Sequence, residues 1–278
     1  MQVFNIVWDV DPILVKLGSI ELRYYGLLWG IGFLLALEFM TRLFKREKYP
    51  DEWIDKLFVY SIVSVVIGAR IGHCFFYAWE YYSQHPLEIF KIWEGGLASH
   101  GGVFALILTM IWFSYKITKK SVWWLFDRMI PAVAIVAGCI RLGNLMNSEI
   151  FGYPTDLPWG FQFIQSQEWQ SLYNAHGEAL ACHPTQIYEI LYCLVAGITA
   201  WVMYRKYGLQ RYVGLITGVS LIIFFGSRFA LEFMKNPQVE KEISMVFNLG
   251  QQLSIPLILL GIYLIVTAKK RKEAFGVL

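Results

Sequence analysis

The chain has 278 residues, of which 56% are hydrophobic and only 16% are charged, and its mean hydropathy is +0.47. This composition excludes an ordinary soluble globular domain. The net charge of +3 is small, and the basic residues occur in short clusters beside apolar segments, which argues against a surface that binds nucleic acid.

Seven apolar stretches follow one another along the chain, each long enough to cross a bilayer as a helix. The residues before the first stretch carry Asp9 and Asp11 and have neither a basic leader nor a small-residue cleavage motif, so we do not expect a cleavable signal peptide. We predict one all-α integral membrane domain over residues 1–278, with seven transmembrane helices. The expected spans are residues 22–42, 57–79, 98–115, 129–146, 184–204, 212–235 and 252–268.

Lysine and arginine are concentrated in alternate loops. Basic clusters follow the first, third and fifth spans and occupy the C-terminal tail, whereas residues 148–182 contain no lysine or arginine. The positive-inside rule therefore places the basic loops and the C-terminus in the cytoplasm, and an odd number of spans then places the N-terminus outside. The clusters are residues 42–56, 116–128, 205–211 and 269–272.

Residues 148–183 form a connection that is too long for a simple loop, and we expect an extracytoplasmic elaboration there. Its aromatic residues leave two interpretations open, an interfacial cap at the headgroup level and a surface that holds a peptide. These residues are Phe151, Tyr153, Trp159, Phe161, Phe163, Trp169 and Tyr173. Residues 80–94 and 236–250 are the other two expected external connections.

Cysteine and histidine are too scattered for a disulfide framework or a metal motif. Three cysteines lie within spans, and Cys182, the one expected outside, has no obvious partner. The sequence contains neither a CxxC nor an HExxH motif, so we expect no metal and no cofactor.

Polar residues within the spans gather near the ends expected to face outside, at a depth estimated from a rise of ~1.5 Å per helical residue. Charged residues in membrane helices usually face the bundle interior and mark a site. Two structural alternatives compete: snorkelling to headgroups, which suits Tyr24 and Lys235, and a simple helix pair between Arg228 and Glu232. The outer set also contains Arg70, His73, His100, Arg141, Asn144, Asn147, His183, Gln186, Glu189, Gln251, Gln252 and Ser254.

Three arginines of this set, Arg70, Arg141 and Arg228, lie about a turn or more inside apolar sequence, where snorkelling fits poorly. We expect them to converge in an outer cavity that binds an anion, because a guanidinium matches phosphate bidentately and keeps its charge when desolvated. In a membrane this anion is most simply a phospholipid headgroup.

His100 lies between two glycine pairs at the level of the arginines, and with an ordinary pKa near ~6.5 it is a candidate proton acceptor. The glycines of this region are expected to let helix backbones approach one another closely. They are Gly95, Gly96, Gly101, Gly102, Gly138 and Gly143.

Six motifs in order cover almost the whole chain. They are residues 23–26 (RYYG), 95–102 (GGLASHGG), 138–149 (GCIRLGNLMNSE), 152–160 (GYPTDLPWG), 183–189 (HPTQIYE) and 250–256 (GQQLSIP). Each motif is weak alone, but with all six in this order the chain resembles the bacterial prolipoprotein diacylglyceryl transferases. Arg228 and Glu232 also stand where that family carries an arginine and a glutamate in its sixth span.

The resemblance implies transfer of the diacylglyceryl group from phosphatidylglycerol to the lipobox cysteine of a prolipoprotein, in the bacterial inner membrane with the site toward the periplasmic or outer leaflet. The products are a thioether-linked lipoprotein precursor and glycerol phosphate. The expected catalytic residues are His100, Arg141, Arg228 and Glu232, and whether His100 or a glutamate is the base stays open. The expected phosphatidylglycerol-binding residues are Tyr25, Gly102, Arg141, Asn144, Glu149, Glu189 and Arg228.

Two other classes of seven-span protein remain as alternatives, a transporter and a receptor that bind an anionic ligand in the outer half. A transporter path would place ionisable groups at inner depths as well, and the sequence has almost all of them in the outer half. The chain also lacks an internal repeat, which weakens a transporter built from duplicated halves.

Overall fold

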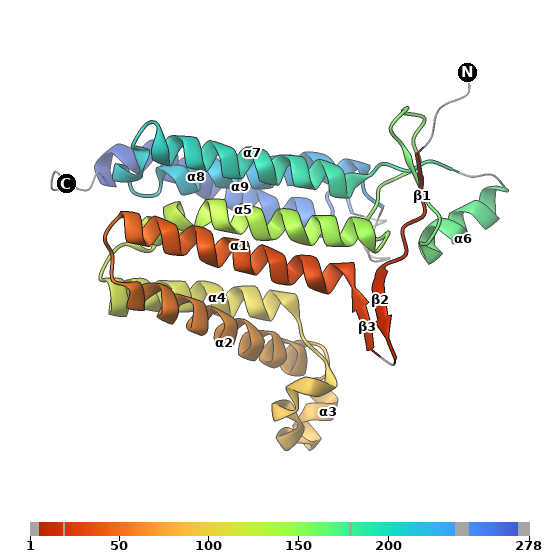
Figure 1. Ribbon diagram of the computed structural model, residues 1–278, viewed down its shortest axis with the longest axis horizontal. Helices are drawn as coiled ribbons and strands as arrows, with labels where there is room; N and C mark the ends of the chain where they lie inside the picture. Colours follow the sequence, from red (N-terminus) through yellow and green to blue (C-terminus); the bar gives the residue numbers. More distant parts are fainter. Residues whose placement is uncertain (1–5, 19, 178–179, 237–244, 272–278) are drawn as a thin grey trace. The chain divides into compact units, whose positions relative to one another are not determined.

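The structure is a computed structural model that describes residues 6–18, 20–177, 180–236 and 245–271. Seven of its helices are long and apolar enough to cross a membrane, which confirms the predicted fold class and spans. The described helices begin and end within seven residues of the expected bounds, and the largest differences are the earlier starts of the second and fourth spans, at Asp51 and Val122. Figure 1 shows these helices: α1 (Tyr24–Arg46), α2 (Asp51–Phe76), α4 (Ser99–Phe113), α5 (Val122–Met146), α7 (Thr185–Arg205), α8 (Leu215–Leu231) and α9 (Leu249–Thr267).

The residues fall into two compact units, residues 1–39 with 127–278 and residues 40–126. In the first unit α8 packs against both α7 and α9. The contact between α8 and α9 is close because a Cβ on Gly218 would lie only 2.8 Å from the carbonyl oxygen of Gly261. Buried Asp127 accepts hydrogen bonds from the backbone N–H groups of Gly214 at 2.7 Å and Thr217 at 2.8 Å, which fixes the start of α8 to α5.

In the second unit α2 packs against α4 at a glycine contact. A Cβ on Gly68 would lie 2.6 Å from the carbonyl oxygen of Gly101, so the predicted close backbone approach is confirmed for Gly101. Gly95 has a different role, because nothing lies near its Cβ position and its φ is 87°. Three short helices join α2 to α4, namely α3 (Trp79–Gln84), η1 (Pro86–Phe90) and η2 (Ile92–Glu94).

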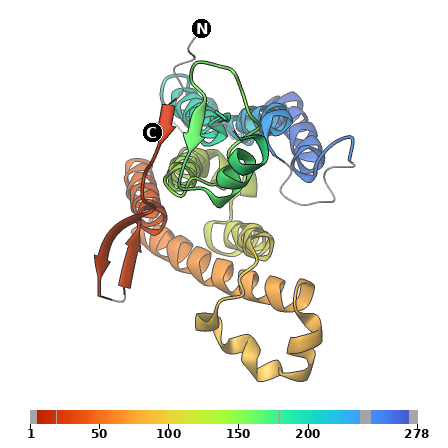
Figure 2. The same cartoon turned by 90° about the vertical axis from the view of Figure 1, so that its right-hand side faces the viewer.

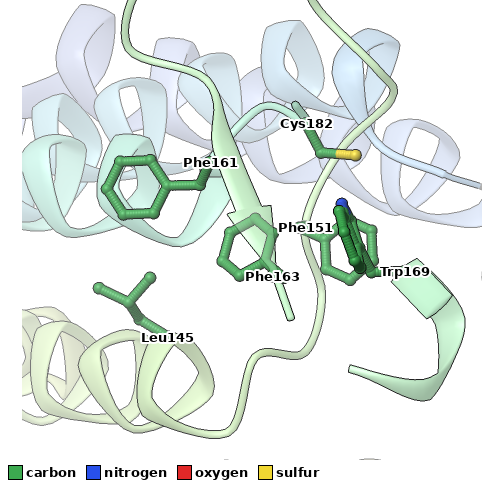
Figure 3. Packing of buried hydrophobic residues seen from close by; sticks show 6 residues of the cluster. All are labelled: Leu145, Phe151, Phe161, Phe163, Trp169 and Cys182. Carbon is green, nitrogen blue, oxygen red and sulfur yellow. The ribbon is translucent and has the colours of Figure 1, made fainter. Parts of the chain in front are cut away.

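Residues 148–182 fold around a small core (Figure 3). Phe151, Phe161, Phe163 and Trp169 are buried with Leu145 and Cys182, so these four aromatic residues serve packing rather than membrane anchoring or peptide binding. The segment contains β4 (Phe161–Phe163) and α6 (Gln167–His176).

Four short strands were not predicted. β1 (Ile6–Trp8) pairs in parallel with β4, which places the N-terminal segment beside residues 148–182. β2 (Ile13–Leu17) and β3 (Ile20–Arg23) form an antiparallel hairpin that leads directly into α1. Strands of three to five residues carry too little periodicity to be recognised in a sequence dominated by apolar helices.

Candidate functional site

The site lies in the first unit, at the end where four helix termini lie together (Figure 1). They are the C-terminal ends of α5 and α8 and the N-terminal ends of α7 and α9. On α5, Arg141 donates from Nη1 to Asn144 Oδ1 at 3.0 Å. Asn144 donates in turn to Glu149 Oε1 at 2.8 Å. Because Arg141 and Asn144 are three residues apart on one helix face, the α5 backbone itself sets this pair.

Glu189 on α7 is fully buried and holds two cations. Its Oε2 lies 2.8 Å from Arg141 Nε, an ion pair without hydrogen-bond alignment, and its Oε1 accepts a hydrogen bond from Lys235 Nζ at 2.8 Å. The start of α7 is fixed by Gln186, whose side chain donates to the backbone carbonyl of Glu149 at 2.6 Å. A buried carboxylate needs such partners, because an unpaired charge in the membrane interior is strongly unfavourable.

Arg228 and Glu232 form the second half of the site. Arg228 Nε lies 3.4 Å from Glu232 Oε1, and Lys235 Nζ lies 3.5 Å from the same oxygen. Asn248 donates to Glu232 Oε2 at 3.0 Å, so the carboxylate lies beside the first turn of α9. The positive end of the α9 dipole favours an anion there. A Cβ on Gly250 would lie 2.6 Å from the Glu232 carboxyl carbon, so this approach needs glycine.

Lys235 joins the two halves, and the snorkelling interpretation of this residue is wrong. Its side chain is 4% exposed and contacts both Glu189 and Glu232. Its backbone is also bridged to Gly152, which ties the segment of residues 148–182 to the end of α8. The sequence spacing of Arg228, Glu232 and Lys235, at i, i+4 and i+7, is the signal that could have identified it.

The resulting network is continuous across four helices, and its acidic and basic members differ in exposure. Glu189 is fully buried and the side chain of Glu232 is 9% exposed, whereas the side chains of Arg141 and Arg228 are 22% and 38% exposed. Each arginine is held at Nε by a glutamate beneath it. Among the described residues, neither Nη2 of Arg141 nor either terminal nitrogen of Arg228 has a hydrogen-bond partner, so these donors are open to an anion.

Tyr25 of α1 packs against Gly143 of α5. A Cβ on Gly143 would lie 2.8 Å from Tyr25 Cδ2 and 3.3 Å from its Cα, so glycine at this position lets α1 reach α5. Tyr25 is half-buried, and its neighbour Gly143 is two residues from Arg141 in the sequence of α5. The structure therefore brings Tyr25, Arg141, Asn144, Glu149, Glu189, Arg228 and Glu232 into one unit.

Arg70 does not have the open donors expected of an anion-binding arginine. It is buried, and its guanidinium donates to the backbone carbonyls of Ile89 at 2.9 Å and of Glu88 and Gly95 at 2.6 Å. The expectation of three equivalent arginines is thus wrong for Arg70, which fastens residues 86–96 to α2. His100 and Gly102 are also in the second unit, where exposed His100 opens α4 and Gly102 packs near Val65 of α2.

Within the described ranges, no three histidine, cysteine, aspartate or glutamate side chains gather closely enough to hold a metal ion. All four cysteines are free thiols.

Comparison with known proteins agrees with the motifs. A sequence profile described as prolipoprotein diacylglyceryl transferase matches residues 12–267. The chain is 44% identical to the phosphatidylglycerol–prolipoprotein diacylglyceryl transferase of Porphyromonas gingivalis, with 95% of each chain covered. It is 42% identical to the enzyme of the same name from Chloroherpeton thalassium, with 96% of each covered, and 38% identical to that of Tolumonas auensis, with 95% and 98% covered. The chain therefore belongs to the prolipoprotein diacylglyceryl transferase family of enzymes.

Proposed function

We propose that Arg141 and Arg228 hold the phosphate of phosphatidylglycerol while its diacylglyceryl group passes to the lipobox cysteine of a prolipoprotein. As a member of its family, the chain is a multi-pass membrane transferase that moves a diacylglyceryl group in lipoprotein maturation. The family does not favour the alternatives of a transporter or a receptor.

The observation that carries the proposal is the way both arginines are held. Each lies with its Nε beside a glutamate carboxylate, while Nη2 of Arg141 and both terminal nitrogens of Arg228 have no hydrogen-bond partner in the described part of the chain. A guanidinium fork matches two phosphate oxygens and remains charged in a site of low polarity. Two such forks supported by one network are suited to a single phosphodiester headgroup.

In the proposed reaction the cysteine sulfur forms a bond to the glycerol carbon of the diacylglyceryl group, and the bond from that carbon to the phosphate oxygen breaks. The products are a thioether and glycerol phosphate. Negative charge develops on the departing phosphate, and the arginines stabilise it more in the transition state than in the bound lipid. The thiol, with an ordinary pKa of ~8.5, must lose its proton before it is an effective nucleophile.

His100 is the proposed acceptor of the thiol proton. The glutamates are the alternative, but Glu232 already contacts Arg228, Lys235 and Asn248. This arrangement suits Glu232 for orienting Arg228 rather than for taking a proton. Glu189 has the corresponding role for Arg141.

The remaining family positions are proposed to line the lipid headgroup. Asn144 and Tyr25 position phosphate or glycerol oxygens, and Glu149 orients Asn144 through its 2.8 Å hydrogen bond. Gly102 provides space beside the lipid. We place the enzyme in the bacterial inner membrane with its N-terminus outside, its C-terminus in the cytoplasm and the site toward the outer leaflet, as the distribution of lysine and arginine predicts.

The test uses purified enzyme in nanodiscs with radiolabelled phosphatidylglycerol and a lipobox peptide. We expect label on the peptide cysteine and release of glycerol phosphate in equal amounts. A matched peptide with serine in place of cysteine should remain unmodified, because a hydroxyl is a much weaker nucleophile than a thiolate. Transfer to the serine peptide, or label on the cysteine peptide without released glycerol phosphate, would contradict the proposed chemistry.

A further inference from the structure

The β2–β3 hairpin has two chemically different faces. Directly paired residues of an antiparallel ladder share a face, and successive residues alternate between faces. Val15 pairs with Leu22, whereas the neighbouring pair on the opposite face is Lys16 with Glu21. The hairpin is therefore amphipathic across its thickness.

The polar face is internally paired. Glu21 lies 3.5 Å from Lys16 Nζ and 3.1 Å from Arg23 Nη2. The hydrogen bond from Arg23, together with the charge of Lys16, lowers the pKa of Glu21, so the carboxylate is ionised at neutral pH. This face has one carboxylate between two bases, which leaves a net positive charge that suits lipid phosphates.

The apolar face is uncovered by the described protein. Val15 and Leu22 are each 42% exposed and Leu17 is 66% exposed. A patch of this kind on both strands of a hairpin indicates an external apolar partner. It differs from the β1–β4 pair, whose phenylalanines are buried in the core of residues 148–182.

The position of the hairpin identifies that partner as lipid. β3 ends at Arg23 and α1 begins at Tyr24 without a linker, and Tyr24 N–H donates to the Pro12 carbonyl at 3.1 Å. The hairpin runs across the axis of α1 in Figure 1, and in Figure 2 it points away from α5, α7 and α8 of its own unit. A segment joined in this way to the end of a membrane-spanning helix lies at the level of the bilayer surface, where lipid is an apolar partner within its reach.

We propose that the β2–β3 hairpin lies flat on the lipid surface, with Val15, Leu17 and Leu22 in the boundary between headgroups and acyl chains. The start of α1 carries further exposed apolar side chains, such as Leu27 and Trp29. Amphipathic segments held in this way insert about 5–10 Å into the boundary region. The hairpin thereby fixes the level at which α1 enters the bilayer and, through Tyr25, the level of the site beside Gly143.

Two neighbouring residues provide a matched test, because Lys16 and Leu17 lie on opposite faces of the hairpin and both are exposed. Leu17→Cys and Lys16→Cys are each spin-labelled in the full-length protein in nanodiscs, with the parent chain labelled in parallel to subtract the native thiols. We expect the label at position 17 to be more accessible to oxygen and the label at position 16 to a water-soluble nickel chelate.

Equal accessibility to the nickel chelate at both positions would overturn the proposal, because it would show a hairpin clear of the lipid. A label at position 17 that is exposed to water until a lipobox peptide is added would also overturn it and would identify a peptide-docking face instead. These outcomes do not depend on the proposed transfer reaction, since no substrate is needed for the first measurement.

The effect on the site is tested with charged residues on the apolar face. Leu17→Glu with Leu22→Glu is expected to lower transfer in vesicles severalfold, whereas Lys16→Gln with Glu21→Gln on the polar face should leave transfer almost unchanged. An equal effect of both double variants, or none from either, would overturn the depth-setting role. Since Leu17 is exposed, its substitution disturbs little protein packing.

Discussion

Arg70 in α2 and Arg141 in α5 both lie inside membrane-spanning helices, yet their guanidinium groups meet different partners. Arg70 is buried and donates from all three nitrogens to backbone carbonyls of residues 88–95. Arg141 is fixed by one carboxylate and one amide and keeps Nη2 without a partner in the described part of the chain. Arg228 resembles Arg141 in this respect.

We propose that this difference separates a structural arginine from the arginines that bind the substrate. All three nitrogens of Arg70 donate to backbone carbonyl groups of the segment that connects α2 to α4. These hydrogen bonds hold the segment in place and stabilise the fold. Carboxylates beneath Arg141 and Arg228 orient these side chains and leave donors for a ligand. All three arginines lie within apolar helices, so their position in the sequence does not distinguish them. Arg70 is buried, whereas Arg141 and Arg228 are partly exposed, and this difference agrees with the difference in partner chemistry.

The strongest test of this comparison removes the open arginines. Arg141→Gln and Arg228→Gln should each lower the rate of diacylglyceryl transfer by about 10²–10³, the usual effect of losing a preorganised donor to a developing oxyanion. Radiolabel transfer to the lipobox peptide measures the rate, and thermal unfolding checks the fold. Arg141→Lys and Arg228→Lys keep the charge but lose the fork, so partial activity below wild type is expected. Near-normal turnover of folded Arg141→Gln would remove the phosphate role.

Lys235 tests whether the two arginines act as one unit. Lys235→Met removes the cation between Glu189 and Glu232, and the two carboxylates then reorient Arg141 and Arg228. A misplacement of about 1 Å lowers a rate by up to about 10²-fold, and we expect a loss of that order in kcat.

The control for a simple loss of folding is charge compensation. Loss of one member of a buried pair destabilises a protein by about 3–5 kcal/mol, because the remaining charge has no partner. Glu189→Gln combined with Lys235→Met should recover stability but not the full rate, since Arg141 loses its carboxylate. Lys235→Arg should retain most of both. Full activity of folded Lys235→Met would contradict a positioning role.

The sequence identified the helices and most members of the site for different physical reasons. Apolar runs of this length have one stable form in a bilayer, because every backbone polar group must be bonded within the helix. Helix depth then placed Arg141, Asn144, Glu189 and Arg228 at one level. The partners of a side chain depend on tertiary contacts, so the sequence could not distinguish Arg70, whose carbonyl partners lie 18 to 26 residues away.

Lys235 shows a second limit of sequence reasoning. A lysine at the end of a span usually reaches the headgroups, and this general expectation concealed its buried contacts. The buried position depends on Glu189 from another helix, 46 residues away in sequence. The strands β1 and β4 are likewise brought together from distant parts of the chain, and neither shows a pattern that specifies the other.

The Arg70 side of the comparison predicts a change in stability without a catalytic defect of the same size. Arg70→Met leaves carbonyls of residues 88–95 without their charged donor, and we expect a loss of about 2–3 kcal/mol in unfolding free energy. Thermal unfolding in detergent measures the loss, and transfer per folded molecule should fall less than in Arg141→Gln. If Arg70→Met kept its stability but lost as much activity as Arg141→Gln, the distinction between an arginine with all donors bonded and arginines with donors left for a ligand would fail.

Cys182 extends the comparison to a second buried group, a thiol, and its expected effect is the smallest. Burial, with a lesser contribution from the charge of Glu168, raises the pKa of this thiol from 9.0 to about 12. Between these pH values the unfolded chain releases the proton while the folded chain retains it, so unfolding free energy should fall as pH rises. Cys182→Ala should weaken that alkaline dependence in melting curves recorded below and above pH 9. The folded thiol should also resist iodoacetamide at pH 9, because the thiolate is the reactive form, and rapid alkylation there would contradict a closed core.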